Sequence, residues 1–391
     1  MITVIRRGTV FAPQPLGVKD IWIFGERIGS IVEPGAVNVE GVSVKTIDAE
    51  GFTVAPGIID PHVHILGGGG EGGPATRAPE IRVEDIIRSG VTTVIGCLGT
   101  DGVTRHASSL LAKARALDIE GVTAYIFIGS YEVPVRTLTG SVRSDLALID
   151  KIIGAGEVAV SDHRSSQPTF EEIARLAAEC RVGGLLGGKA GVLHLHLGSG
   201  ARKLEMLFRL TAETEIPPTQ VIPTHANRNR ALLEEGLRWI QGGGWADLTA
   251  GTEPEKESDE DVSVETALRL ARERGVPLER FTVSSDSNGS LPVFDSRGEL
   301  TGLTVASQDA LLSTFRSLVR RNILSLEETV RLFAFNPARF YKLERKGELA
   351  PGKDADLILL DKDLALKGVI ARGAEMMSGA RLLVRGTFRP A

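Results

Sequence analysis

Eight apolar, β-type runs alternate with helical segments along most of this 391-residue chain. The runs are GIIDPHVHI (57–65) and the segments 91–100, 123–133, 158–163, 191–198, 220–227, 245–251 and 281–288. The stretches between them, such as FEEIARLAAECR, have the periodicity of amphipathic helices. Eight such units over about 250 residues predict an α/β fold with a (β/α)8 TIM-type barrel. An open doubly wound sheet is the alternative, since periodicity alone does not exclude it.

The barrel is favoured by the polar residues that end these runs, which are His, Asp, Glu, Thr or Asn. The carboxyl ends of barrel strands form the face on which barrel enzymes carry their active sites. We therefore predict a barrel domain over residues 56–346, with its functional site at this face.

The two ends of the chain resemble each other and differ from the middle. Residues 1–55 and 347–391 consist of short β-rich runs broken by Gly, Pro and Asp. Strands bounded by turn residues at both termini are typical of one small sheet domain. We predict that the two ends together form a composite β-sandwich domain.

Composition argues against several classes of protein. A net charge of −5 and the lack of any basic cluster argue against nucleic-acid binding. No apolar run reaches the roughly 20 residues that a membrane span requires. The two cysteines, Cys97 and Cys180, lie in apolar or helical surroundings, which is typical of a reduced, cytoplasmic protein.

Five residues form a pattern that suits metal binding. His62 and His64 are two residues apart on the first predicted strand, so both imidazoles point to one side. Taken alone, this pair fits metal ligands and hydrogen-bonded pocket histidines equally well. His196, His225 and Asp286 end the fifth, sixth and eighth predicted strands, and in a barrel those ends converge. Four histidines and a carboxylate at one depth predict a divalent-metal hydrolase.

These motifs resemble the amidohydrolase superfamily, and more closely its isoaspartyl (β-aspartyl) dipeptidases. The stretches that carry the resemblance are PGIIDPHVHILGGGGEGGPATRAPE, LGTD, GSYEVPVRTLTGS, SDHRS, RVGGLLGGKAGV, PTHANRN, SSDSNGS and ELAPGKDADLILL. They extend over nearly the whole chain, so the resemblance also covers the predicted end domain.

The resemblance implies a metallo-dipeptidase that cleaves β-aspartyl dipeptides with two divalent ions, zinc foremost, bridged by hydroxide. His62, His64 and Asp286 would hold the more buried ion, and His196 and His225 the more exposed one. Asp286 would also take the proton of the attacking hydroxide and pass it to the leaving amine. The resemblance further implies a homo-oligomer, an octamer built from dimers.

One position departs from the family's pattern. Where the family has a bridging lysine carboxylated on its ε-nitrogen, this chain has Glu157, and Lys151 is assigned to the preceding helix. Glutamate keeps two carboxylate oxygens but is shorter by roughly 3–4 Å. We expect a bulge at GAGE, with one extra residue, to bring Glu157 to the metals. The alternative is that Glu157 misses them and leaves a single ion.

A β-aspartyl dipeptide carries one amine and two carboxylates, so its recognition requires two cations and one anion. Arg164 and Arg228 are the candidate cations, and Glu71 in the glycine run is the candidate anion. The resemblance adds Thr100 and Ser290 as partners of the aspartyl end, and Tyr131 to polarise the scissile carbonyl.

Interpretations without a functional role stay open for several of these residues. The glycine run could be a mobile linker, the two arginines surface charges, Tyr131 a core residue and Ser290 a turn residue. His106, His163 and His194 have no assigned role. His194 shares its strand face with His196 and could support the metal site from behind, but a packed structural histidine is the preferred interpretation. Two alternative functions are a dihydroorotase or hydantoinase-type cyclic amidase and a non-catalytic scaffold on the same fold.

Overall fold

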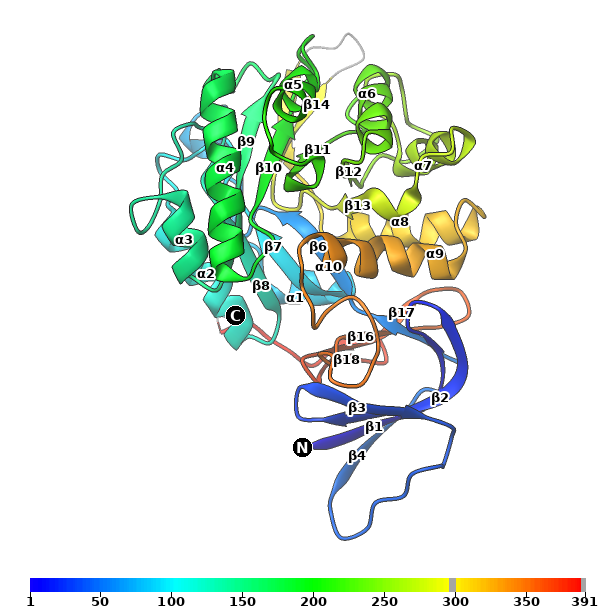
Figure 1. Cartoon of the computed structure of the whole chain (residues 1–391). Coiled ribbons are helices and arrows are strands. Elements are labelled where there is room, and N and C mark those ends of the chain that lie inside the picture. The colour runs from blue at the N-terminus through cyan, green and yellow to red at the C-terminus, as the bar shows by residue number, and fades with distance from the viewer. Residues whose placement is uncertain (295–299, 388–391) are drawn as a thin grey trace.

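The computed structural model describes residues 1–294 and 300–387, and eight parallel strands form its centre (Figure 1). These are β6 (Ile58–Val63), β7 (Val91–Gly96), β8 (Thr123–Ile128), β9 (Ile152–Val160), β10 (Val192–Leu197), β11 (Val221–Thr224), β12 (Ala246–Thr249) and β13 (Phe281–Ser284). The first six form one curled parallel sheet, and β12 pairs with β13. β12 lies against β11, and β13 lies against β6. All eight predicted strands are therefore present, in a mixed α/β fold.

Helices follow the strands and cover the outside of this curled sheet (Figure 1). They are α1 (Val83–Arg88), α2 (Ala107–Ile119), α3 (Val142–Leu148), α4 (Phe170–Gly187), α5 (Glu205–Glu213), α6 (Arg230–Gln241), α7 (Val264–Glu273), α8 (Asp309–Arg320), α9 (Leu326–Val330) and α10 (Asn336–Phe340). Single turns are η1 (Pro74–Thr76), η2 (Pro218–Gln220), η3 (Leu278–Arg280) and the π-helical η4 (Arg331–Phe335). Among the described residues, no helix has the length and apolar character needed to cross a membrane.

α4 shows how local sequence sets these helices. Thr169 caps its first turn through a reciprocal pair of hydrogen bonds with Glu172, which satisfies backbone donors that a helix start leaves free. Ile173, Leu176 and Ala177 then recur at helical spacing and are buried against the sheet. Gly188 ends the helix in the left-handed conformation, with φ of 64°.

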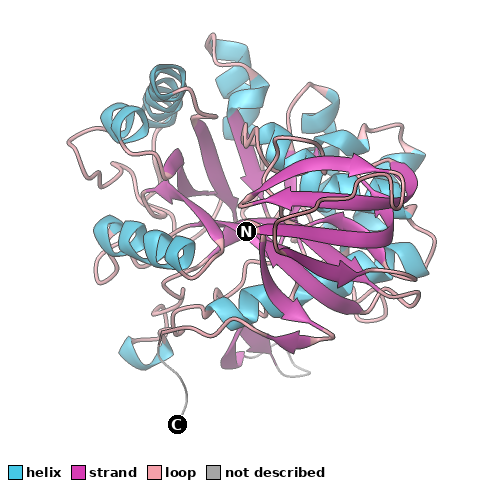
Figure 2. Ribbon diagram, turned by 90° about the horizontal axis from the view of Figure 1, so that it is seen from below, coloured by secondary structure: helices cyan, strands magenta, loops and turns pink. Residues whose placement is uncertain are grey.

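Strands from both chain ends join in a nine-stranded sheet, visible from below in Figure 2. They are β1 (Ile2–Phe11), β2 (Pro15–Phe24), β3 (Arg27–Val32), β4 (Val44–Asp48), β5 (Thr53–Pro56), β16 (Leu357–Leu360), β17 (Leu366–Ala371), β18 (Ala374–Ser378) and β19 (Arg381–Leu382). The two ends meet where β5 pairs antiparallel with β16. Residues 388–391 of the predicted end domain and 295–299 of the predicted barrel lie outside the described residues.

A hairpin of β14 (Ser290–Phe294) and β15 (Leu300–Val305) follows β13. The hairpin therefore begins close to the carboxyl end of β13, where the predicted site lies.

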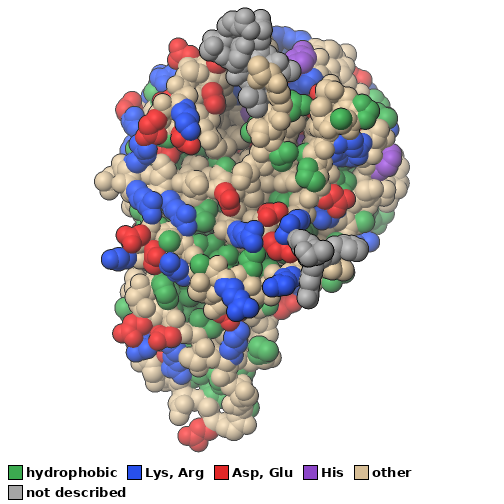
Figure 3. Space-filling view, turned by 180° about the vertical axis from the view of Figure 1, so that it is seen from behind, with side chains coloured by type: hydrophobic (Ala, Val, Ile, Leu, Met, Phe, Trp, Pro, Cys, Tyr) green, Lys and Arg blue, Asp and Glu red, His purple; other side chains and the backbone are tan. Residues whose placement is uncertain are grey.

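Acidic and basic side chains are interspersed over the face of the molecule shown in Figure 3.

Two details of the fourth strand differ from the sequence analysis. β9 begins at Ile152, six residues before the predicted start at residue 158, because the buried run containing Gly154 and Gly156 continues the strand. Lys151 does not belong to a helix. It lies in the turn between α3 and β9, where its ammonium group pairs with the carboxylate of Asp118.

Candidate active site

Glu157 lies at the centre of a cluster formed by the four predicted histidine ligands. Its Oε1 is 3.4 Å from His64 Nε2, and its Oε2 is 3.0 Å from His196 Nδ1. The same Oε2 is 3.6 Å from His62 Nε2 and 3.8 Å from His225 Nε2. One carboxylate therefore faces ligands from both predicted ion positions, which is the placement a bridging group requires.

Asp286 approaches the same cluster from the end of β13. Its Oδ1 is 3.0 Å from His64 Nε2 and 3.3 Å from His62 Nε2, and 15% of its side chain is exposed. Asp286 and His225 both have a left-handed backbone, with φ of 53° and 60°. Residues other than glycine adopt this conformation at a cost of about 1–3 kcal/mol, and such strain concentrates at functional sites.

The six predicted ligands fit a divalent metal by the chemistry of their donor atoms. His62 Nε2, Glu157 Oε1 and Asp286 Oδ1 are buried and have no hydrogen-bond partner among the described residues. Leaving buried polar atoms unpaired is costly, and a cation bound between these lone pairs removes that cost. Two overlapping groups, His62–His225–Asp286 and Glu157–His196–His225, have their donor atoms within 4.8 Å of one another.

Three of the four histidines are also held through the other ring nitrogen. The partners are His194 Nε2 for His62 Nδ1 (2.7 Å), Asp162 Oδ2 for His196 Nε2 (3.1 Å) and Thr249 Oγ1 for His225 Nδ1 (2.7 Å). The Nδ1 of His64 lies 3.8 Å from Cys97 Sγ. Such outer contacts fix the tautomer and the ring orientation of a metal-binding histidine. The interpretation of His194 as a packing residue alone is therefore incomplete.

A bulge in β9 explains how the short Glu157 side chain reaches the cluster. Ala155 pairs with Leu193 and Val158 with Leu195, so β9 holds one residue more than β10 over this stretch. Gly156 in the bulge has φ of 148°, and a Cβ there would lie 2.5 Å from the carbonyl oxygen of His194. The expected extra residue is thus present, and only glycine fits beside it.

Glu157, His225 and Tyr131 have charge states that suit metal binding and proton transfer. Burial raises the pKa of Glu157, but the charges of His62 and His196 outweigh this and hold its pKa well below the ordinary value. Burial lowers the pKa of His225 to about 3, so its imidazole is neutral, as a metal ligand must be. Burial and the charge of Glu157 raise the pKa of Tyr131 well above its usual range, so its hydroxyl keeps its proton.

The predicted substrate-binding residues gather beside this cluster. Glu71 Oε1 accepts a hydrogen bond from Thr100 Oγ1 at 3.1 Å, and its Oε2 accepts one from Ser290 Oγ at 3.2 Å. Arg164 Nη1 lies 3.3 Å from Glu71 Oε1. The hydroxyl of Tyr131 lies 2.8 Å from His196 Nδ1, which places it at the edge of the metal cluster.

The two arginines differ in their surroundings. Arg164 is gripped by Asp162 through two bonds, from Nε at 3.0 Å and Nη2 at 2.8 Å. Arg228 donates its backbone N–H to the carbonyl oxygen of His225, and its buried Nε has no partner among the described residues. Neither arginine is a free surface charge, so that interpretation is wrong for both.

Arg105 holds the glycine run in place. Its guanidinium donates to the carbonyl oxygens of Leu66, Gly68, Gly69 and Ala78, at 2.9 to 3.3 Å, and to Asp101 Oδ2 at 3.1 Å. The side chain is 5% exposed. This fixed arrangement contradicts the interpretation of the glycine run as a mobile linker. Arg105 was not predicted from the sequence, because a single arginine near a helix start carries no local signal of such contacts.

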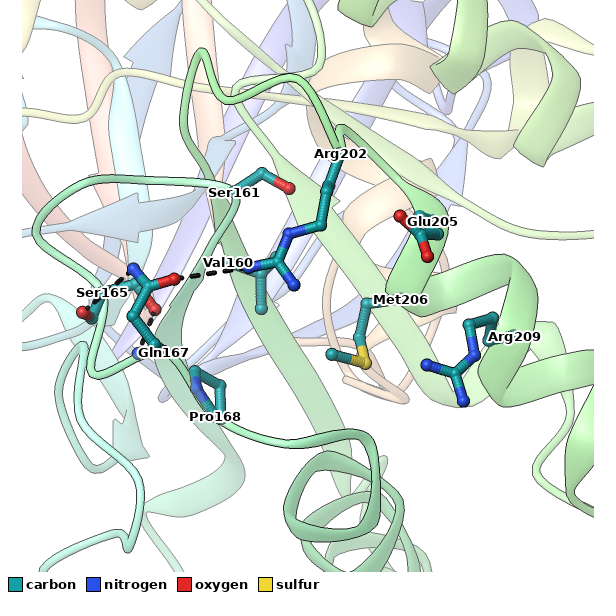
Figure 4. Close-up of a pocket in the computed structure, with 9 residues that line it drawn as sticks. All are labelled: Val160, Ser161, Ser165, Gln167, Pro168, Arg202, Glu205, Met206 and Arg209. Atoms are coloured by element: carbon teal, nitrogen blue, oxygen red, sulfur yellow. Dashed lines mark hydrogen bonds between the residues drawn. The ribbon is translucent and has the colours of Figure 1, made fainter.

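A separate pocket lies between the β9–α4 loop and α5 (Figure 4). Its lining consists of Val160, Ser161, Ser165, Gln167, Pro168, Arg202, Glu205, Met206 and Arg209. Arg202 donates to Gln167 Oε1 across it at 3.3 Å. None of these residues is a predicted metal ligand or substrate-binding residue. His106 and His163 are exposed.

The chain is similar to known proteins both in sequence and in structure. The sequence pattern of the amidohydrolase family matches residues 193–382. A β-aspartyl dipeptidase from Fervidobacterium islandicum AW-1, solved in complex with β-Asp-Leu dipeptide, superposes with a TM-score of 0.90 at 46% identity, covering 98% of each chain. A second structure of a β-aspartyl dipeptidase from that organism gives 0.89 at 44% identity, again covering 98% of each chain. A dihydroorotase from Lactobacillus gasseri is 24% identical, over 92% of this chain and 89% of its own length.

Proposed function

We infer the reaction from one premise: this chain belongs to the β-aspartyl dipeptidase family of the amidohydrolases. It is a metal-dependent hydrolase that cleaves the peptide bond of dipeptides, and we propose β-aspartyl dipeptides as its substrates. The observation that carries the proposal is Glu71 with Thr100, Ser290 and Arg164 directly beside the histidine cluster. A cyclic amidase needs no such set of charged groups for a free amine and carboxylates.

We propose that His62, His64 and Asp286 hold one divalent ion, that His196 and His225 hold a second, and that Glu157 bridges both. When bound, such ions lower the pKa of a water molecule and polarise the scissile carbonyl. Zinc suits this set of imidazoles and carboxylates, although other divalent ions accept the same ligands.

Asp286 is the proposed proton carrier. Burial raises its pKa, but the close imidazoles of His62 and His64 outweigh this and keep its pKa well below the ordinary value, so the group starts as a carboxylate. It takes a proton from the attacking water and returns it to the amide nitrogen as the C–N bond breaks. Tyr131 keeps its proton and donates a hydrogen bond to the carbonyl oxygen as negative charge develops there.

Charged groups at the rim are proposed to select the β-linked substrate. Glu71 binds the free amine, and Thr100 and Ser290 bind the aspartyl end. Arg228, whose Nε has no partner among the described residues, binds one carboxylate. Arg164 binds the other and exchanges its contact with Glu71 for the substrate's carboxylate.

The proposal also covers the domain organisation, the cellular location and the oligomeric state. The eight strands act as one closed (β/α)8 barrel over residues 56–346, supported by the parallel bridge between Val63 and Ser287. Residues 1–55 and 347–391 form a β-sandwich domain, supported by a separate apolar cluster that joins residues such as Ile5 and Leu357. We also propose a cytoplasmic homo-oligomer, an octamer by family resemblance, with no nucleic-acid or membrane partner.

The test is to incubate purified protein with β-Asp-Leu, α-Asp-Leu and dihydroorotate, each with and without a chelator. We expect cleavage of β-Asp-Leu alone, lost on chelation and restored by Zn²⁺. Metal analysis should give close to two equivalents per chain if Glu157 bridges two ions. Cleavage of dihydroorotate would favour the cyclic amidase, and inertness toward all three substrates would favour the scaffold.

A further inference from the structure

Cys97 lies inside the ring of strands at the depth of the histidine cluster. Gly96 pairs with Val63 in the parallel register, and the N–H of Cys97 donates to the carbonyl oxygen of Val63 at 3.0 Å. Ile95 and Cys97 both belong to the apolar cluster in the interior of the ring. Side chains two residues apart on a strand share a face, so the thiol points inward beside His64.

The surroundings of the thiol are those of a ligand position. Cys97 is 1% exposed, and its Sγ has only long contacts, 3.7 Å to the carbonyl oxygen of Val63 and 3.8 Å to His64 Nδ1. The donor atoms of His62, His64, Glu157 and Cys97 all lie within 4.8 Å of one another. His62 Nε2 and Glu157 Oε1 in this group are buried and unpaired, which points independently to a cation there.

We propose that the Cys97 thiolate is a direct ligand of the ion that His62 and His64 hold. This rests on the proposed function, because it assigns a further ligand to the same metal centre. The thiol releases its proton to solvent when the metal–sulfur bond forms. Thiolate is a soft ligand, so the position held by His62 and His64 would prefer zinc or cadmium to manganese or magnesium.

The competing interpretation is that Cys97 only fills space in the apolar interior. The chain offers a matched control, since Cys180 in α4 is equally buried and belongs to none of the candidate metal groups. The experiment titrates metal-free protein with Cd²⁺ and with Co²⁺ while the near-ultraviolet spectrum is recorded. Wild type, Cys97→Ser and Cys180→Ser are compared, and bound metal is measured for each.

A thiolate bound to Cd²⁺ or Co²⁺ gives a charge-transfer band that imidazole and carboxylate ligands do not give. We expect this band in wild type and in Cys180→Ser, and its loss in Cys97→Ser. Zinc affinity should fall in Cys97→Ser by more than the about 10–100-fold that loss of an outer contact produces. The ratio of zinc to manganese affinity should fall with it.

Two results would overturn the assignment. One is that wild type binds metal but gives no charge-transfer band. This result would reject Cys97 as a ligand without contradicting the proposed hydrolysis of β-aspartyl dipeptides. The other is a band that survives in Cys97→Ser. By contrast, wild type that neither binds metal nor cleaves β-Asp-Leu would reject the proposed function itself.

A measurement on wild type alone keeps the test decisive if Cys97→Ser fails to fold. X-ray absorption of the zinc-loaded protein should show a sulfur neighbour at about 2.3 Å from zinc. A first shell of nitrogen and oxygen only would reject Cys97 as a ligand.

Discussion

The two halves of the candidate site are built differently. In the metal half, side chains project from strands or from the first or second residue after a strand, and the central carboxylate of Glu157 is 1% exposed. In the substrate half, the groups come from loops or, for Ser290, from the first residue of β14, and 24% of the Glu71 side chain is exposed. His62, His196 and His225 in the metal half have outer partners, whereas Glu71 in the substrate half contacts Thr100, Ser290 and Arg164.

The difference follows from what each half has to do. Metal ligands need fixed positions, and rigid strands with outer contacts supply them. Groups that bind a substrate must exchange their mutual bonds for bonds to the ligand, which exposed loop residues do at lower cost. Asp162 joins the halves, since it bonds both His196 and Arg164.

The largest expected effect comes from the metal half. Asp286→Asn removes the proposed proton carrier but keeps the size of the side chain, so kcat should fall about 10²–10⁴-fold. Bound metal, measured on the same sample, should stay nearly unchanged. Asp150→Asn, on an exposed turn before β9, is the control and should behave as wild type. Full turnover by Asp286→Asn would remove Asp286 from the mechanism.

The second effect concerns the substrate half. Glu71→Gln removes a charged partner of the substrate amine, worth about 1.5–3 kcal/mol, or about 10–150-fold in KM. kcat and metal content should change little. Glu80→Gln, in the same segment but paired with Lys113 at the surface, is the matched control. If Glu71→Gln loses metal instead, the division of the site into two halves is wrong.

Asp162→Asn should affect both halves at once. Loss of the bond to His196 should weaken metal binding by about 10–100-fold. Loss of the charge that grips Arg164 should raise KM as well, because the guanidinium is no longer aligned. Metal titration and steady-state kinetics on one preparation separate the two effects. An effect on KM alone would show that His196 needs no outer partner.

The smallest effect is expected for Arg105→Lys. Lysine keeps the charge but lacks the fork that reaches four carbonyl oxygens, so the glycine run should loosen. We expect a loss of about 1 kcal/mol in substrate binding, about fivefold in KM, with kcat retained. Faster proteolysis near Gly70 should accompany it. Arg136→Lys, on the exposed surface nearby, is the control, and equal behaviour of the two variants would reject the clamp.

Sequence predicted the fold to the extent that its signals are local. The eight strands follow from apolar runs with polar ends, and the HxH pair follows from alternation along one strand. The start of β9 was predicted wrongly, because Gly154 and Gly156 resemble a turn until the neighbouring strands are present.

The six candidate metal ligands were named from the sequence, and the structure brings these residues together. Metal binding by them stays a proposal. Other supporting residues were missed for a physical reason. Asp162, Thr249 and Arg105 act through contacts between segments far apart in sequence, and no local pattern fixes the direction of a side chain across a barrel.

The bulge at Gly156 has a consequence for how the centre is completed. A carboxylated lysine requires carbon dioxide to react with an amine after the chain has folded. With Glu157 as the proposed bridging anion, carbon dioxide is not a reactant. Assembly of the metal centre should therefore proceed equally well in buffers purged of bicarbonate. Glu157→Lys alone should therefore not recreate the carboxylated lysine, because that side chain is longer than glutamate by roughly 3–4 Å and would extend beyond the position of the Glu157 carboxylate.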